Sequence, residues 1–410
     1  MKRVLSLLLM TSLSPLAAFA QEAEPGGVFY SLDFGQTFEA STDQDLTTEA
    51  EEKGLVSLTS LGFEAVTETR TQRLSFEFGS RLRGSEGEFS DDRLNALLAY
   101  SRNSADAMFE VSLQSLREDI AFLRDVSGFI SDDGEIILPD DFDDLTGDGI
   151  RTETVFSTSF IWGETAPVGY ELRASQQILR YEDASSDLID SDTVDLSFGV
   201  RLDLNEVTTG NISLGYSQTD EVGSPLTELT TLSGALTFAR PLGELTTQIS
   251  ASRDENDDIF WAALVERDFE FSNGDLSGAI GFVEDENGDA RLTGRIDLSF
   301  PRPSSQFDFS LAHSLSPGED RASTTFSAGY LQELSPVSSM QVGFDFLQTS
   351  NPDGSDVLAT AGLSASYGVS LTENWQMNVG ARVDLLDDDG DRSTSNTVFL
   401  TLERPFSWRP

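Results

Sequence analysis

Apolar and polar residues alternate with a period of two in run after run of this chain. In the segment 293–320, Ile296, Leu298 and Phe300 occupy every second position, and the charged Asp297 lies between them. Successive side chains of a β-strand point to opposite faces, so this period places the apolar residues on one face and the polar residues on the other. The segment therefore predicts strands with one apolar and one polar face.

The same pattern recurs along almost the whole chain, and no helical period competes with it. It predicts about 20 strands, within a range of roughly 18–22. The predicted strands cover residues 28–38, 55–67, 72–83, 93–103, 106–117, 151–163, 167–180, 193–204, 209–218, 229–239, 244–253, 259–268, 275–284, 289–300, 305–313, 321–333, 338–348, 357–371, 374–386 and 394–404.

The connections between these runs alternate in charge. Acidic loops such as 182–192 and 284–289 follow the odd-numbered runs, whereas short and nearly neutral turns such as 164–167 and 240–243 follow the even-numbered runs. Roughly 45 of the 71 acidic residues lie in the odd connections. A soluble sandwich has no reason to sort its acids in this way, whereas a protein whose two ends face different compartments does.

These observations predict an all-β fold, a transmembrane antiparallel up-and-down β-barrel. Lipid would cover the apolar face, water would cover the polar face, and closure would satisfy every backbone hydrogen-bonding group. The runs of about 9–13 residues are long enough for a tilted strand to cross a bilayer, which needs roughly 9–11. Short turns then lie on the periplasmic side and acidic loops outside the cell. A secreted all-β solenoid or propeller is the alternative.

The N-terminal residues have the organisation of a secretory signal peptide. Lys2 and Arg3 precede the apolar stretch 4–16, and a small-x-small cleavage site ends at Ala20. An uncleaved anchor helix is the alternative, which the short length of the stretch disfavours. The predicted organisation is a signal peptide at 1–20, a short periplasmic segment at 21–27 and a single outer-membrane barrel at 28–410 with a long loop at 118–150.

Acidic residues dominate the charge of the chain. The sequence has 71 Asp and Glu against 26 Lys and Arg, a formal net charge of −45. Nucleic acid is therefore excluded as a partner, because phosphate binding needs a basic footprint. The 28 Phe residues in alternating runs argue against disorder. With no cysteine and one histidine, His313, we expect no enzymatic activity.

The signal sequence MKRVLSLLLMTSLSPLAAFA, the alternating columns and the acidic, cysteine-free composition resemble proteobacterial outer-membrane β-barrel proteins of the porin type. The resemblance is architectural, and no short motif identifies a subfamily. It implies the outer membrane of a Gram-negative bacterium, contact with its lipids and lipopolysaccharide, insertion by the barrel-assembly machinery, and a homotrimer. Arg404 departs from the family pattern, because it interrupts the last apolar column before Phe406 and Trp408.

Strand parity assigns many charged residues to the barrel interior. Columns of opposite charge can tune the selectivity of a pore, but paired charges can also do no more than keep the wall polar. For a single residue the second interpretation is favoured, whereas the whole set favours an aqueous, charge-lined pore. The residues predicted to line the lumen are Arg81, Arg83, Arg173, Arg201, Arg291, Arg295, Arg382, Glu64, Glu77, Glu110, Glu171, Asp195, Asp297, Asp308, Asp345 and Asp384.

Aromatic residues beside the short turns predict a girdle at the membrane interface. These residues are Trp162, Tyr170, Phe300, Phe307 and Trp375. Ordinary strand aromatics are the alternative interpretation.

Two acidic loops partly match the opening of a calcium-binding loop. The positions are Asp144 and Asp148 in one loop, and Asp387, Asp389 and Asp391 in another. Neither loop lies between helices, so acidic turns are the simpler interpretation. We expect no cofactor beyond Ca²⁺ or Mg²⁺ loosely bound at the acidic loops.

The predicted barrel is too wide for its side chains to fill, because about 20 tilted strands give a diameter of roughly 40 Å. The first predicted strand begins about eight residues after the cleavage site, which argues against a plug domain and hence against a plugged TonB-dependent receptor. The long loop 118–150 mixes apolar residues such as Ile120 and Phe122 with acids. It is the candidate constriction if it folds inward, and an external lid is the alternative.

The sequence therefore predicts a porin-like channel for passive diffusion of small hydrophilic solutes through a charge-lined lumen. A barrel for surface-polymer export, or a structural or surface-anchoring outer-membrane protein, is the alternative.

Overall fold

The structure is a computed structural model of the chain. It describes residues 27–43, 54–85, 88–120, 149–184, 188–285, 287–315, 321–351, 355, 357–388 and 390–409. The predicted signal peptide, the segment up to residue 26 and most of loop 118–150 lie outside the described residues. Among the residues that are described, no helix is long and apolar enough to cross a membrane.

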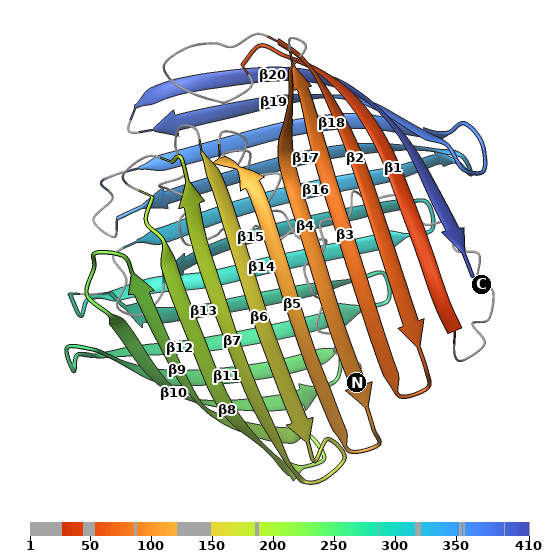
Figure 1. The fold of residues 1–410 in the computed structure, drawn as a ribbon. Helices are drawn as coiled ribbons and strands as arrows, with labels where there is room; N and C mark the ends of the chain where they lie inside the picture. The colour runs from red at the N-terminus through yellow and green to blue at the C-terminus, as the bar shows by residue number, and fades with distance from the viewer. Residues whose placement is uncertain are drawn as a thin grey trace.

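The described residues form one closed antiparallel sheet of 20 strands (Figure 1). Each strand pairs with the next one in the chain, and β1 also pairs with β20, which confirms the predicted up-and-down barrel. The strands are β1 (Gly27–Ser41), β2 (Gly54–Glu68), β3 (Gln72–Ser85), β4 (Glu88–Asn103), β5 (Ala107–Asp119), β6 (Ile150–Trp162), β7 (Val168–Glu182), β8 (Ser191–Asn205), β9 (Thr208–Glu221), β10 (Thr227–Arg240), β11 (Gly243–Asp254), β12 (Ile259–Phe271), β13 (Gly274–Glu284), β14 (Ala290–Arg302), β15 (Ser305–Leu315), β16 (Ala322–Ser335), β17 (Ser338–Ser350), β18 (Leu358–Ser370), β19 (Gln376–Asp388) and β20 (Asp391–Trp408).

The strands on opposite walls of the barrel cross at a large angle, as tilted strands of a barrel do (Figure 1). The connections keep the predicted alternation at one end, because a short turn follows every even-numbered strand, from 69–71 after β2 to 371–375 after β18. The end of the barrel with the short turns is called the turn end below, and the opposite end is called the loop end.

Apolar columns lie on the outer face of the sheet. Ile212 and Leu214 of β9 are 53% and 52% exposed, and Leu232 of β10 is 56% exposed. The alternate residues Ser213 and Ser233 lie on the opposite face, where their hydroxyl oxygens are 2.6 Å apart. A continuous apolar surface that no protein covers is the surface of a barrel that contacts lipid.

Several strands are longer than the hydrophobic pattern predicted. β4 spans Glu88–Asn103 where the pattern predicted 93–103, and β20 spans Asp391–Trp408 where it predicted 394–404. Only residues 86–87 separate β3 from β4, and only 389–390 separate β19 from β20, so the prediction of acidic loops there was wrong. Apolar periodicity marks only the part of a strand that lipid covers, whereas backbone pairing continues into polar residues beyond it.

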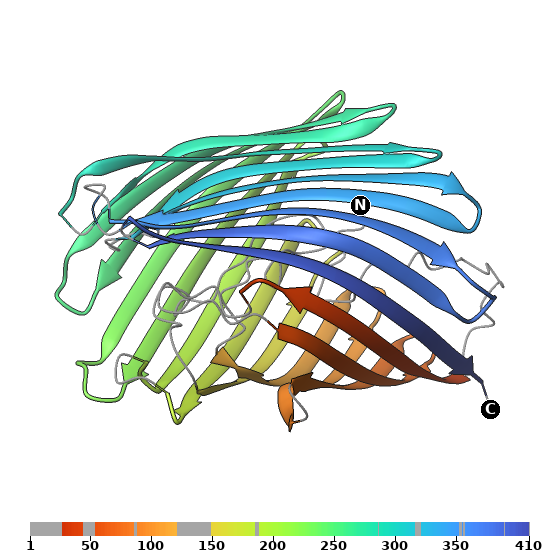
Figure 2. The ribbon, with the colours of Figure 1, turned by 90° about the horizontal axis from the view of Figure 1, so that it is seen from above.

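The barrel closes between its first and last strands, which lie side by side near the C-terminus (Figure 2). The rings of Tyr30 and Trp408 stack on the outer face with their centroids 5.5 Å apart. On the inner face, the hydroxyl oxygens of Thr37 and Thr401 are 3.0 Å apart. The C-terminal strand therefore contributes both faces of the closing contact.

The loop end of this seam is held by a buried carboxylate. Asp43 is only 2% exposed, and its Oδ2 accepts a 2.8 Å hydrogen bond from the hydroxyl of Ser393 at the start of β20. The hydroxyl of Ser395 donates to the backbone oxygen of Asp43, as does that of Ser41. The segment that follows β1 is thereby fastened to β20.

We expect Ser393→Ala to weaken the seam, because it removes a buried hydrogen bond to a charged group. Such a bond contributes about 1.5–3 kcal/mol. The variant should lose its compact, heat-modifiable migration in detergent gels at a lower temperature than the wild type. Ser407→Ala, at an exposed position of the same strand, is the matched control. Equal conversion temperatures for both variants would contradict the role of Asp43.

Candidate functional site: the inner wall of the barrel

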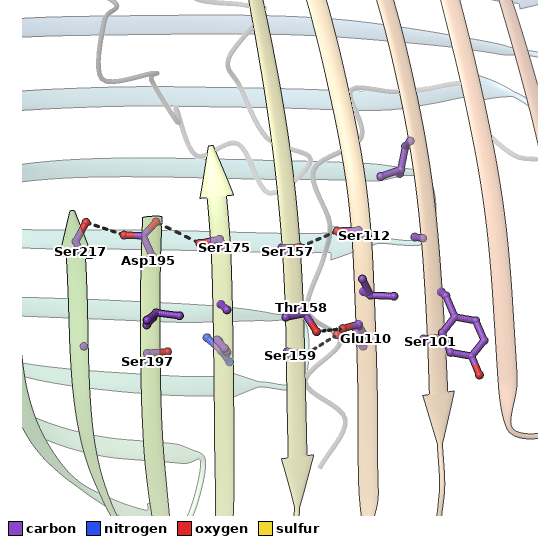
Figure 3. A pocket seen from close by; sticks show the side chains of 18 of the residues that line it. Ser101, Glu110, Ser112, Ser157, Thr158, Ser159, Ser175, Asp195, Ser197 and Ser217 are labelled. Carbon is purple, nitrogen blue, oxygen red and sulfur yellow. Dashed lines mark hydrogen bonds between the residues drawn. The ribbon is translucent and has the colours of Figure 1, made fainter. Parts of the chain in front are cut away.

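A row of hydroxyl groups crosses the inner wall from β5 to β9 (Figure 3). The hydroxyl oxygens of Ser112 and Ser157 are 2.7 Å apart. Asp195 accepts hydrogen bonds from Ser175 at 3.2 Å and from Ser217 at 2.7 Å. Strand register places these residues in one row, because each is the cross-strand partner of the next. The row is polar, and its side chains are small.

These side chains line a recess of about 640 Å³ along the strands β3 to β10. A recess in a closed sheet forms on its concave side, and the alternate residues of the same strands form the exposed apolar columns. The polar column therefore faces the lumen. Ser75, Ala99 and Thr231 continue this lining on β3, β4 and β10.

The structure places the sixteen charged residues predicted for the lumen on this polar face. Their neighbours across the strands share the same parity, as Asp297 with Ser310 and Asp345 with Gly362 illustrate. Their contribution to conduction is a separate matter and stays a prediction. Many of them are paired, which reduces the charge they present to the lumen.

Ion pairs along and between strands neutralise several of these side chains. Arg382 binds Asp384 at 2.6 Å. Arg295 binds Asp297 at 2.7 Å and lies 3.4 Å from Glu266 of β12. Glu171 and Arg173 form a further pair on β7. These contacts match the interpretation in which individual charges keep the wall polar.

Other acids on the same wall have a serine hydroxyl as their partner. Glu64 accepts a 3.4 Å hydrogen bond from Ser31, and Asp308 accepts a 2.7 Å bond from Ser299. Glu64 is also the cross-strand partner of Glu77, so two carboxylates lie side by side. The inner wall therefore has more acidic than basic groups to offer a solute.

Arg201 has a structural task that parity did not indicate. Its Nη2 donates to the backbone oxygens of Gly163, Glu164 and Ala166 at 3.0, 2.9 and 2.9 Å. All three oxygens belong to the turn between β6 and β7. Gly163 has a φ of +73°, and a Cβ there would lie 2.5 Å from the oxygen of Val168. The arginine and the glycine together fix this turn.

The sequence prediction missed a buried charge cluster at a β-bulge. Asp92 is 3% exposed and binds both Arg81 and Arg83. The register between β3 and β4 shifts at this point, so the extra residue points inward. Nearby, Arg93 binds Glu118 at 3.0 Å. The run of acids at 91–92 was interpreted as a loop, and no apolar periodicity there could have corrected this.

Two predicted girdle residues stack beside a turn. The rings of Trp162 and Tyr170 are 5.0 Å apart, and Phe198 lies 6.5 Å from Trp162. Phe300 and Phe307 are cross-strand partners beside the turn between β14 and β15. The structure thus groups these aromatics at the turn end, and their contact with a membrane interface stays a prediction.

Trp375, the remaining girdle residue, precedes β19 and lies 5.3 Å from the guanidinium carbon of Arg404. The same guanidinium lies 4.4 Å from the centre of the Phe406 ring. Arg404 therefore interrupts the apolar column of β20 in sequence but covers two aromatic rings in space. The Tyr30–Trp408 stack at the seam belongs to the same end of the barrel and was missed, because strand register is needed to see it.

The proposed metal positions do not assemble in the described part of the chain. Asp144, Asp148 and Asp389 lie outside the described residues. Asp387 accepts hydrogen bonds from Arg392 at 2.8 Å and from the backbone of Gly390 at 3.0 Å. Within the described ranges, no group of three or more His, Cys, Asp or Glu side chains is arranged to hold a metal ion. Asp391 is the cross-strand neighbour of Asp388.

Comparisons with known proteins add a fold but no family. No protein-family model matches the chain, and no curated relative matches its sequence. The barrel is similar to the siderophore receptor PirA from Pseudomonas aeruginosa, with a TM-score of 0.52, 11% identity and coverage of 94% of this chain and 81% of that chain.

Two further solved structures are similar. For the ferric-catecholate import receptor Fiu from E. coli K12, the TM-score is 0.56 at 8% identity, over 94% of this chain and 82% of that chain. For the FrpB iron transporter from Neisseria meningitidis, the TM-score is 0.52 at 8% identity, over 94% of this chain and 83% of that chain. At such identities the likeness is one of fold. The chain has an outer-membrane β-barrel fold, and the likeness does not single out the porin type.

A carboxylate at the loop end has a perturbed pKa. Asp285 follows β13, and its side chain is fully buried. Burial alone would raise its pKa, but hydrogen bonds from Arg291 and from the backbone of Asp289 and Asn287 outweigh burial and hold the pKa below the usual value. The distances of these bonds are 2.8, 2.9 and 3.0 Å.

A carboxyl group with a lowered pKa stabilises the folded loop at any pH above its unfolded pKa of about 3.9, and this contribution is lost as the pH falls through the folded value. We expect ¹³C carboxyl titration in detergent to give Asp285 a midpoint below that of a free Asp. Arg291→Gln should raise the midpoint, because it removes a donor and a positive charge. Arg253→Gln, which removes the partner of the exposed Asp257, should leave it unchanged. An unaltered midpoint in Arg291→Gln would refute the explanation.

Proposed function

We propose that this protein is an outer-membrane channel through which small hydrophilic solutes diffuse passively. The observation that carries the proposal is the inner wall from β3 to β10, where side chains as small as those of Ser112, Ser157 and Ser175 line the recess. A sheet of 20 strands encloses a space that such side chains leave open to water. The fold and the apolar outer face support the location in the outer membrane of a Gram-negative bacterium.

The charge of the wall supports a preference for cations. Glu64 and Asp308 on the lumen face accept hydrogen bonds from serine hydroxyls, and the loop end carries many further acids. Such a mouth concentrates cations and repels anions within a screening length of about 8–10 Å. Lipopolysaccharide, the barrel-assembly machinery during insertion, and two further copies in a trimer are the partners that this location implies.

Two other functions compete with passive diffusion. Export of a surface polymer, or a purely structural role, fits the same barrel without requiring conductance. Regulated import is suggested by the names of the similar structures, which are a siderophore receptor, an import receptor and an iron transporter. These names describe those proteins, and neither alternative invokes an enzymatic activity.

We expect the purified protein to form stable ion-conducting channels in planar bilayers, because water fills the lumen. Conductance should rise with salt concentration and persist after deletion of residues 121–148 from the long connection between β5 and β6. Absence of conductance both with and without this segment, in protein that still migrates as a heat-modifiable barrel, would reject the channel. Conductance that appears only after the deletion would favour a gated importer.

We expect the cation-to-anion permeability ratio to exceed one. The variant E64Q/E77Q should lower this ratio by roughly twofold at low salt and less at high salt, because salt screens the wall charges. The variant R382Q/D384N is the matched control, since it removes one positive and one negative charge from the same wall. Equal changes in both variants would show that the two glutamates do not set the selectivity.

A further inference from the structure

The outer face of the turn end carries charge of one sign only. In the half of each strand next to the short turns, the outward-facing described residues include arginines but neither Asp nor Glu, although the chain has 71 acids. Strand register fixes the outward direction, since Arg102 is the partner of the exposed Phe109 and Arg267 is the partner of Leu245. These arginines are Arg102, Arg240, Arg267, Arg302 and Arg404.

Three of them lie on every second strand of one part of the wall: Arg240 on β10, Arg267 on β12 and Arg302 on β14. This group is called the arginine rim here. Strands are about 4.8 Å apart, so consecutive members are two strand spacings, roughly 10 Å, apart across the sheet. Along the strands they are staggered, because Arg240 is the partner of Gly243, and Arg267 is in register with Gly278 and Ile296, six residues from Arg302. The rim therefore presents an array of positive charges along the membrane surface.

Aromatic rings hold two members of the rim at the level of the girdle. The guanidinium carbon of Arg267 lies 4.6 Å from the centre of the Phe269 ring, and that of Arg240 lies 5.6 Å from the centre of the Phe238 ring. Long cationic side chains at such positions extend toward the lipid headgroups while their stems contact apolar surface. The rings leave the hydrogen-bond donors of both arginines free.

These donors have no acceptor within the described chain. Nη1 of Arg267 is buried without a hydrogen-bond partner, and so is Nε of Arg404, which lies on the same face. No carboxylate of the described residues forms an ion pair with Arg240 or Arg302. A buried N–H without an acceptor is costly, so a shift of these side chains toward an acceptor outside the protein is favourable.

Three arginines on the outer face at the loop end, Arg180, Arg253 and Arg392, are different, because they are paired with acids. Arg180 donates two hydrogen bonds of 2.9 Å to the carboxylate of Asp192. Arg392 binds Asp387 at 2.8 Å. These loop-end arginines therefore have acidic partners in the protein, whereas the arginine rim at the turn end has none among the described residues.

We propose that the arginine rim binds the phosphate groups of anionic phospholipids in the periplasmic leaflet of the outer membrane. A guanidinium can donate two parallel hydrogen bonds to a phosphate and stack on a ring at the same time, which an ammonium cannot. The proposal depends on the orientation of the barrel, with its turn end in the periplasm. It does not depend on whether the lumen conducts.

The test is native mass spectrometry of the full-length barrel in detergent, titrated with phosphatidylglycerol or with phosphatidylcholine of the same acyl chains. We expect the wild type to bind phosphatidylglycerol more tightly. The variant R240Q/R267Q/R302Q should weaken phosphatidylglycerol binding at least about tenfold, since each basic side chain near the surface contributes severalfold to anionic-lipid affinity. Binding of phosphatidylcholine should change little.

The variant R180Q/R253Q/R392Q is the matched control, because it removes the same charge from the same face at the opposite end. It should bind phosphatidylglycerol like the wild type. An equal loss in both triple variants, or no preference of the wild type for phosphatidylglycerol, would overturn the proposal. Loss of lipopolysaccharide binding in the rim variant, with phosphatidylglycerol binding intact, would overturn the assignment to the periplasmic leaflet.

Heat-modifiable migration establishes that each variant is folded. If the glutamine variant does not fold, R240K/R267K/R302K replaces it, because this variant keeps the charge and loses the paired hydrogen bonds. It should retain a preference for the anionic lipid with an affinity between those of the wild type and of phosphatidylcholine. An affinity equal to that of the wild type would show that guanidinium geometry has no role. A barrel that binds phosphatidylglycerol through the rim but does not conduct would refute the channel and leave this inference standing.

Discussion

Every backbone N–H and C=O that lies in hydrocarbon must find its hydrogen-bond partner within the protein, and the rest of this structure depends on that constraint. An open sheet would leave two unsatisfied edges, so the first and last strands have to pair. Here they do so through twelve residue partners from Tyr30 to Ser41, with Trp408 stacked at one end and Asp43 fastened at the other. Closure also separates the two faces of the sheet, so that the outer face contacts lipid and the inner face lines the lumen.

Once the sheet is closed, side-chain parity determines the chemistry of each surface. The outer columns of leucine, isoleucine and phenylalanine need no protein partner, because lipid covers them. The inner columns must be polar but cannot fill the enclosed width, so they bond along the wall instead of across it. The row from Ser112 to Ser217 shows this, since its hydrogen bonds run from strand to neighbouring strand. A wall that satisfies itself in this way does not need side chains that reach across the barrel.

Local periodicity was sufficient to predict the strands, the barrel and the face on which most charged residues lie. It failed where the information is not local. Asp92 points inward because a bulge shifts the register, and a bulge has no apolar signature. Arg201 bonds to carbonyl oxygens 35 to 38 residues earlier in the chain, a contact that depends on how β6, β7 and β8 lie beside one another. The predicted strand ends were wrong for a related reason. Strands continue into polar residues beyond the lipid, where apolar and polar residues no longer alternate.

The difference between the two ends of the barrel follows from the different surfaces that they would meet. The outer leaflet of such a membrane carries the phosphates of lipopolysaccharide, and an acidic loop end can approach them only through divalent cations or at a distance. Among the described residues, the strand halves next to the short turns have outward arginines and no outward acids, so anionic headgroups attract this face directly. Both effects favour the same orientation of the barrel, with the turn end against the anionic headgroups of the periplasmic leaflet. A chain with a formal net charge of −45 can thus still have one end that favours the lipid surface. The few outward arginines that have no acidic partner would then determine the depth and orientation of the barrel, whereas the paired arginines of the lumen and the loop end determine its shape.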